Sequence, residues 1–289
     1  MASLKEIKSR IQSVKSTQKI TSAMKMVSSA KLRKAQKRIE NFYPYERKLT
    51  HILNNFLSAE TDNTSVYAEN REVKRVAILV FSSNSSLCGG FNSNVAKRLH
   101  AVMERYNHLG KENILIYPVG KKIAKVAKKM DFFVDNFDEM ADKPTYAAAQ
   151  DLADDLMELF INHTIDKVEL IYHHFNNKSS QILVDETLLP IRLEVNPEKQ
   201  SGMQLNYIVE PDRNTIMNDL IPKVLRLKTY TALIDSNASE HAARTIAMQT
   251  ATDNADDLLQ ELNLQYNKSR QQAITNELLD IIGGSFGQK

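Results

Sequence analysis

Apolar residues near the start of the chain recur at the spacing of an amphipathic helix. Steps of three and four residues place them on one narrow face, as in a coiled-coil seam. After a polar break, the same spacing resumes. The members of this predicted stripe are Leu4, Ile7, Ile11, Val14, Ile20, Met24, Val27 and Ala30. We therefore expect a long N-terminal helix over residues 1–57, with a bend at Tyr43-Pro44, where proline removes a backbone donor.

The end of the chain carries a second long helical pattern. Residues 223–282 contain neither Gly nor Pro, and a continuous helix of that length would extend about 90 Å, which exceeds a compact domain. The apolar positions expected on its seam are Leu258, Leu262, Tyr266, Ala273, Leu278 and Ile281. Small residues that permit close helix approach precede them at Ala238, Ala242, Ala247, Ala251 and Ala255. Either the two ends pack on each other, or each packs on an ordinary core; their length favours the first arrangement.

The middle of the chain has the pattern of an α/β domain. Strands are predicted over 76–81, 114–119, 132–134 and 168–173, with helices from Val95 onward and over 121–130 and 146–162. This alternation predicts a mainly parallel sheet covered on both faces. Two short strands, 181–184 and 187–191, would complete it as an antiparallel edge. We expect an inserted domain over 73–193, linkers over 58–72 and 194–211, and a C-terminal helix within 207–289.

Composition adds a charge asymmetry to this picture. The 289 residues are 42% hydrophobic and 25% charged, with one cysteine, which is typical of a soluble protein of one or two domains. Residues 1–50 hold 13 Lys or Arg against 3 Asp or Glu, a balance of +10, whereas the remainder has a balance of −7. This basic helix predicts an acidic protein partner, a phosphate backbone or an anionic membrane, and the charge alone does not choose among them.

The loop Ser85–Asn92 is the first candidate for chemistry, because it follows the first strand and precedes a helix. Phosphates bind at that position in α/β folds. The loop nevertheless lacks both GxGxxG and GxxxxGK[ST], which favours a structural loop over a nucleotide site. Cys88 has no His or carboxylate near it in sequence. His173 and His174 are adjacent, so in a strand they point to opposite faces and cannot share a metal. The pattern predicts no catalytic residue, cofactor site or metal site.

Motifs at both ends and in the middle resemble those of one family. They are Ile7–Ile11, Ser16–Val27, Ser86–Asn92, Ser239–Arg244, Ala247-Met248, Ala251–Ala255, Tyr266–Gln271, Ile274–Glu277 and Gly283-Gly284. In this order they resemble the gamma subunit of F-type ATP synthase, over essentially the whole chain. One departure is Ser83–Ser86, where the family usually has an acidic or arginine residue before Leu-Cys-Gly-Gly, and it bears only on local loop contacts. No insertion with a cysteine pair is present, which favours the bacterial type over the redox-regulated chloroplast type.

The resemblance implies a fold and a role. The terminal helices would form an antiparallel coiled coil with an inserted Rossmann-like α/β domain. The chain would be the central rotor stalk, non-catalytic and present once per complex. Its partners would be the alpha and beta subunits of the catalytic hexamer, the epsilon subunit and the membrane ring of c subunits. It would be peripheral to the bacterial plasma (inner) membrane on the cytoplasmic side. Motif matches place partner contacts at Met24, Lys25, Arg244, Gln271, Thr275 and Glu277.

Two other functions compete with this interpretation. A Rossmann-like enzyme would use the loop around Gly89-Gly90 for a dinucleotide, and the isolated chain would then bind nucleotide. A helical nucleic-acid-binding protein would use the basic N-terminal helix, with strongly salt-dependent affinity. Neither explains why the basic helix also carries an apolar seam that is matched at the far end of the chain.

Overall fold

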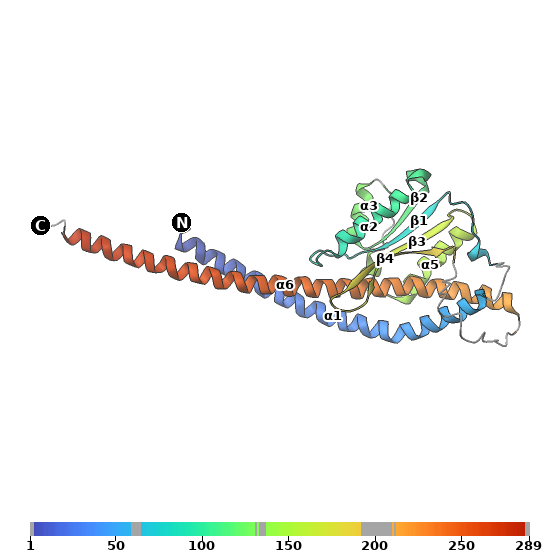
Figure 1. Cartoon of the computed structure of the whole chain (residues 1–289), viewed down its shortest axis with the longest axis horizontal. Helices are drawn as coiled ribbons and strands as arrows, with labels where there is room; N and C mark the ends of the chain where they lie inside the picture. Colours follow the sequence, from blue (N-terminus) through green and yellow to red (C-terminus); the bar gives the residue numbers. More distant parts are fainter. Residues whose placement is uncertain are drawn as a thin grey trace. The chain divides into compact units, whose positions relative to one another are not determined.

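The computed structural model describes residues 3–58, 65–130, 132, 137–191, 210 and 212–286 (Figure 1). Among the described residues, four α-helices, four β-strands and three short 3-10 helices lie between two long terminal helices. In chain order the elements are α1 (Leu4–Ser58), η1 (Val66–Ala68), β1 (Val76–Phe81), α2 (Phe91–Arg105), η2 (Asn107–Leu109), η3 (Lys111–Asn113), β2 (Ile114–Val119), α3 (Lys121–Lys129), α4 (Asp138–Asp142), α5 (Tyr146–Ile161), β3 (Lys167–Phe175), β4 (Gln181–Leu189) and α6 (Arg213–Phe286).

The two terminal helices confirm the long helical patterns at both ends. A capping box starts α1: the Ser3 backbone N–H donates to Glu6 Oε2 at 2.8 Å, and the Glu6 N–H donates to Ser3 Oγ at 3.3 Å. The helix continues through Pro44, where the bend was expected, and α6 likewise contains Pro222. Proline removes one intrahelical hydrogen bond at each position.

The sheet confirms the predicted topology. Its strand order is β2-β1-β3-β4, with the first three strands parallel and β4 antiparallel to β3. The two short strands expected over 181–184 and 187–191 are in fact one strand, β4. Asp185 and Glu186 interrupt its apolar pattern, but both lie within the ladder, opposite Ile171 and Leu170. Because Asp185 and Glu186 are polar, the hydropathy pattern predicted a break in the middle of what is one continuous strand.

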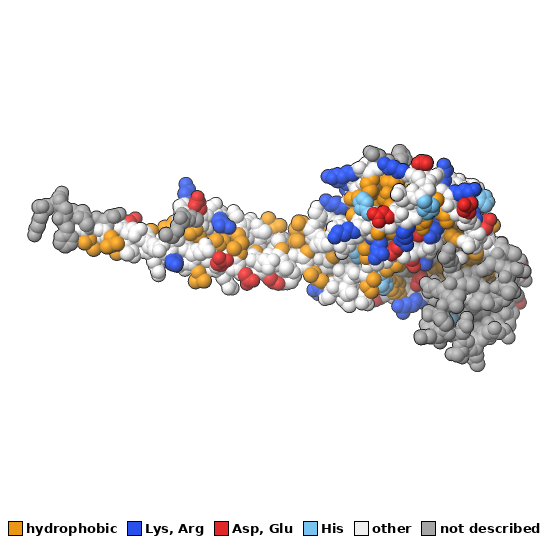
Figure 2. Space-filling view, turned by 45° about the horizontal axis from the view of Figure 1, so that its top comes forward, with side chains coloured by type: hydrophobic (Ala, Val, Ile, Leu, Met, Phe, Trp, Pro, Cys, Tyr) orange, Lys and Arg blue, Asp and Glu red, His pale blue; other side chains and the backbone are white. Residues whose placement is uncertain are grey.

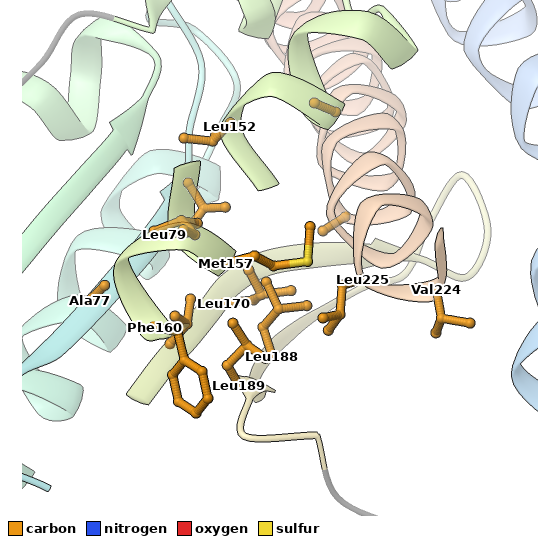
Figure 3. Close-up of a cluster of buried hydrophobic side chains, with 14 of the residues drawn as sticks. Ala77, Leu79, Leu152, Met157, Phe160, Leu170, Leu188, Leu189, Val224 and Leu225 are labelled. Atoms are coloured by element: carbon orange, nitrogen blue, oxygen red, sulfur yellow. The ribbon is translucent and has the colours of Figure 1, made fainter. Parts of the chain in front are cut away.

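Both faces of the sheet are buried, and β1 supplies residues to each in alternation. Val76, Ile78 and Val80 pack with α2 and α3, whereas Ala77, Leu79 and Phe81 face the opposite side. Figure 3 shows that opposite core, in which Leu79 and Leu170 from the sheet lie near Met157 of α5 and Leu225 of α6. Residues 217–233 of the C-terminal helix thus form part of the core of the α/β sheet.

Contacts within the chain divide it into two compact units. Unit 1 comprises residues 1–29 and 244–289, and unit 2 comprises residues 30–243. Unit 2 thus contains the sheet together with parts of both terminal helices. The boundaries at 73 and 193 that we expect for an inserted domain stay a prediction.

Some predicted segments fall outside the described residues. The strand expected over 132–134 is described only at Phe132, and the linker over 194–211 only at Glu210. The other linker contains η1. Across the described residues, no helix combines the length and apolarity that a membrane span requires.

The core in Figure 3 yields a stability prediction. Leu79 is fully buried in the central strand, so Leu79→Ala should lower the free energy of unfolding by about 2–5 kcal/mol through lost burial and a cavity. Urea unfolding monitored by circular dichroism would measure this as a lower midpoint. Ile182→Ala, at an exposed position of β4, is the control and should change the midpoint little; equal effects at the two sites would contradict this description of the core.

Candidate partner-binding surfaces

Within unit 1, the terminal helices pack along one continuous seam. The α1 positions follow alternating steps of four and three residues, and so do the α6 positions; each residue is buried or half-buried. On α1 they are Ile7, Ile11, Val14, Gln18, Thr21, Lys25 and Ser28. On α6 they are Thr245, Met248, Thr252, Ala255, Leu259, Leu262 and Tyr266. The seam has the heptad repeat of a coiled coil.

Side-chain hydrogen bonds between described residues cross this seam and establish that the helices are antiparallel. Gln18 Nε2 donates to Asp256 Oδ1, the hydroxyls of Thr21 and Thr252 lie 2.8 Å apart, and Lys25 Nζ donates to Gln249 Oε1 at 2.7 Å. As numbers rise along α1, those of the partners fall along α6. The centre of the seam is therefore polar.

This polar centre corrects the predicted N-terminal stripe. Ile20 and Val27 are each 58% exposed, whereas Thr21 and Ser28 are buried. The seam continues in phase from Val14 through the polar residues, so the apolar Ile20 and Val27 fall on the outer surface. Thr21 tolerates burial because its hydroxyl donates to the Gln18 carbonyl of its own helix and lies within hydrogen-bond distance of the Thr252 hydroxyl.

The outer surface of α1 in unit 1 is basic as well as apolar. Lys8, Lys15 and Lys19 are exposed, and none forms an ion pair with any residue that the structure describes. The apolar side chains of Ile20 and Val27 are exposed on the same helix. Exposed cations beside apolar residues suit an acidic protein partner with an apolar component.

The last part of α6 exposes an apolar surface that the sequence pattern assigned to the seam. Leu278 and Ile281 were expected to be seam residues, but they are 54% and 69% exposed. Tyr266 lies beside the first turns of α1. Because α6 extends beyond the start of α1, Leu278 and Ile281 have no α1 residues to pack against. Among the described side chains beyond residue 270, the exposed large apolar ones are Ile274, Leu278, Leu279, Ile281 and Ile282. Figure 2 shows hydrophobic side chains at the surface along the narrow, C-terminal part of the molecule.

The six predicted contact residues lie in different environments. Met24 and Lys25 are half-buried, and Lys25 holds Gln249 across the seam. Arg244 is only 7% exposed. The other three, Gln271, Thr275 and Glu277, are exposed on the final part of α6. No single site contains all six, and their role in partner binding stays a prediction.

The loop after β1 is closed by its own side chains. Asn92 Nδ2 donates to Ser83 Oγ at 2.8 Å and to Cys88 Sγ at 3.1 Å, and the Ser83 N–H donates to Asn92 Oδ1 at 3.1 Å. Cys88 is buried. Gly120, on the neighbouring loop, has φ +104°, and an added Cβ would lie 2.5 Å from the Ser82 carbonyl oxygen. These contacts agree with a structural loop.

The adjacent histidines have separate surroundings, as the strand geometry predicts. His173 is buried and stacks on Phe91 with ring centroids 4.4 Å apart. His174 Nδ1 instead donates to Asp235 Oδ2 at 2.6 Å. Among the described residues, no group of three or more His, Cys, Asp or Glu side chains is arranged to hold a metal ion.

Comparison with known families and sequences gives consistent matches. A family model described as "ATP synthase" matches residues 3–286. A protein of Phocaeicola vulgatus named "ATP synthase gamma chain" is 60% identical over 288 residues, covering 99% of this chain and 100% of that protein. The protein of the same name from Christiangramia forsetii is 46% identical over 287 residues, covering 99% and 98%.

Solved structures have the same fold. A chain in the rotor of Euglena gracilis mitochondrial ATP synthase superposes with a TM-score of 0.62 at 18% identity, covering 94% of this chain and 98% of that one. A chain of the central stalk and c-ring structure from Tetrahymena thermophila gives a TM-score of 0.58 at 23% identity, covering 80% and 99%.

His173 yields a pH prediction. Burial lowers the pKa of its imidazole to about 4, below the unfolded value of about 6.5. The unfolded chain therefore binds a proton first as the pH falls, so this contribution to stability is complete above pH about 6.5 and is lost between about 6.5 and 4. Urea midpoints at pH 7 and pH 5 should differ less in His173→Phe than in the wild type. An unchanged difference would contradict the assignment, and the exposed His108→Phe serves as control.

Proposed function

The chain belongs to the gamma-chain family of ATP synthase, and from this we propose that it is the central rotor stalk that couples ion flow to ATP synthesis or hydrolysis. The observation that carries the proposal is the antiparallel helix pair of unit 1, whose seam is internal while its basic and apolar outer surface is left for partners. The chain is a non-catalytic subunit of the enzyme complex.

Rotation can control catalysis because the two-helix shaft is not threefold symmetric. Three identical catalytic sites around it would meet different side chains at any moment. A partner shifts a conformational equilibrium only by the difference in its affinity for the two states. The surface that faces each site therefore sets its nucleotide affinity, and turning the shaft changes that surface.

The family resemblance implies that the beta subunits present an acidic loop to the shaft, and the basic outer surface of α1 suits such a loop. Lys8, Lys15 and Lys19 are exposed. Each exposed ion pair contributes only about 0–1 kcal/mol. Many weak contacts suit a rotor, because no single contact holds it strongly at one angle.

We assign contact with the catalytic subunits to Met24, Lys25 and Arg244, and contact at the top of the hexamer to Gln271, Thr275 and Glu277. The exposed apolar side chains around the last three residues support the second assignment, since apolar surface on a soluble subunit marks an interaction site. The burial of Arg244 gives it the weakest support of the six.

The other proposed partners are the epsilon subunit and the ring of c subunits, both at the α/β part of the chain. One copy would be present per complex. The complex would lie at the bacterial plasma (inner) membrane, with this chain peripheral to it on the cytoplasmic side.

Co-purification of the tagged chain from its native membranes tests the function. We expect stoichiometric alpha and beta subunits, one copy of this chain, and ATP hydrolysis that depends on it. A chain that purifies alone and binds nucleotide would instead favour a Rossmann-like enzyme. A chain that binds DNA or RNA with strong salt dependence would favour a nucleic-acid-binding protein.

Met24 provides a test of coupling. Met24→Lys should leave assembly intact but reduce the number of protons pumped per ATP hydrolysed, because a half-buried ammonium would bind the acidic loop of beta too tightly for exchange. Proton uptake by inverted vesicles, measured with ATP hydrolysis in the same preparation, gives this ratio. Met24→Leu is the matched control and should pump normally. Equal ratios in the two variants would refute the assignment of Met24.

A further inference from the structure

One stretch of α6 in unit 2 is enclosed on all sides. Every residue from Ala232 to Ala242 is buried, whereas a helix at a protein surface normally exposes one face. One side of this stretch packs against α1, through Ile234 and Ala238 with Leu32 and Ile39. The helix therefore passes through the interior of unit 2 here.

Polar side chains of this stretch bind other elements of the unit, and Asp235, Asn237 and Ser239 are the ones whose bonds the structure describes. Ser239 Oγ donates to the His173 carbonyl at 3.1 Å, and Asn237 Nδ2 donates to the Ala141 carbonyl of α4 at 2.9 Å. Asp235, which is 0% exposed, accepts from His174 Nδ1 at 2.6 Å. Tyr43 Oη of α1 donates to the same carboxylate, at 2.6 Å and 2.7 Å from its two oxygens. The sheet, α4 and α1 are thus all bonded to one short length of α6.

These bonds lie on opposite sides of the helix. Residues four apart share a helix face, so Asp235 and Ser239 both point toward the end of β3, where His173 and His174 lie. Asn237 is two residues from each, a turn of about 200°, and it points toward α4. Bonds on opposite sides of an axis resist rotation about that axis.

Apolar packing alone would fix the rotation angle of α6 less closely than these hydrogen bonds do. Burial of apolar surface is non-directional. The side chains of Ala238 and Ala242 are small, so they do not interdigitate deeply with neighbouring residues. Hydrogen bonds require both a distance and an angle. A turn of α6 within its enclosure would break bonds on both sides and leave buried polar groups unpaired, which is costly.

We propose that Asp235, Asn237 and Ser239 form a rotational key, a set of positioning residues that fixes the angle of α6 within unit 2 so that torque applied to the sheet passes to the helix without slip. The proposal rests on the function proposed above. Within that function, torque enters at the α/β part and must reach α6, which continues as one helix to Phe286.

Thr229 offers a matched control. It is also a fully buried polar residue of α6, but its hydroxyl donates to the Leu225 carbonyl of the same helix at 3.0 Å. Its removal disturbs the same core without breaking a bond between elements. Thr229→Val therefore measures the structural cost of changing a buried hydroxyl in this helix.

The test uses the whole ATP synthase complex carrying Asn237→Leu and Ser239→Ala together, compared with the Thr229→Val complex. We expect the key variant to hydrolyse ATP at the control rate but to pump fewer protons per ATP in proteoliposomes. A bead attached at the exposed position Lys178→Cys should show wider angular fluctuations in the key variant. The thermal melting temperature should fall further than in the control, because the Ala141 and His173 carbonyls each lose a donor; the pumping ratio and the angular fluctuations therefore carry the test.

Equal pumping ratios and equal bead fluctuations in the two complexes would overturn the proposal. If the double variant does not assemble, Ser239→Ala alone, which removes one hydroxyl, decides the question by the same two readouts. Failure of the proposed function would be visible separately, because the wild-type chain would not purify with alpha and beta subunits.

Discussion

The structure depends on one helix that changes its surroundings along its length. Residues 217–233 of α6 fill one face of the sheet, residues 232–242 are enclosed, residues 245–266 form a two-helix seam, and the side chains beyond residue 270 are mostly exposed. Each environment selects its own residues. Large aliphatic residues face the sheet, alanine and bonded polar residues fill the enclosed stretch, and an alternating repeat forms the seam. A helix with four environments has no single apolar face, so its amphipathic pattern is weak when it is averaged over the whole length.

The sequence predicted the elements that depend on local pattern. The apolar run Val76–Phe81 predicted a buried strand, and the alternation of strands and helices predicted a mainly parallel sheet, because such sheets are covered on both faces. The absence of Gly and Pro over residues 223–282 predicted a helix too long for a compact domain. These inferences needed only neighbouring residues.

What the sequence did not predict required partners distant along the chain. Hydropathy assigned Ile20 and Val27 to the seam, because nothing local indicates that Thr21 meets Thr252. Asp185 seemed to divide a strand, yet Arg98 and Arg105 hold its carboxylate through ion pairs. Likewise, the contact of Leu225 with the sheet core has no local signal. The predicted contact residues came from motif resemblance, and their partners are other chains.

The separation of Thr21 from its partner, 231 residues along the chain, also has a consequence for biosynthesis. At a translation rate of about 5–20 residues per second, the first helix emerges from the ribosome about 10–50 seconds before Thr252 exists. During that time, its seam residues have no helix from their own chain to cover them. Because Ser28 and Thr21 are polar, the uncovered seam of α1 is less prone to non-specific apolar association than a fully aliphatic seam would be. The hydroxyl groups at the centre of the seam therefore lower the risk of aggregation of the nascent chain during the time before α6 is synthesised.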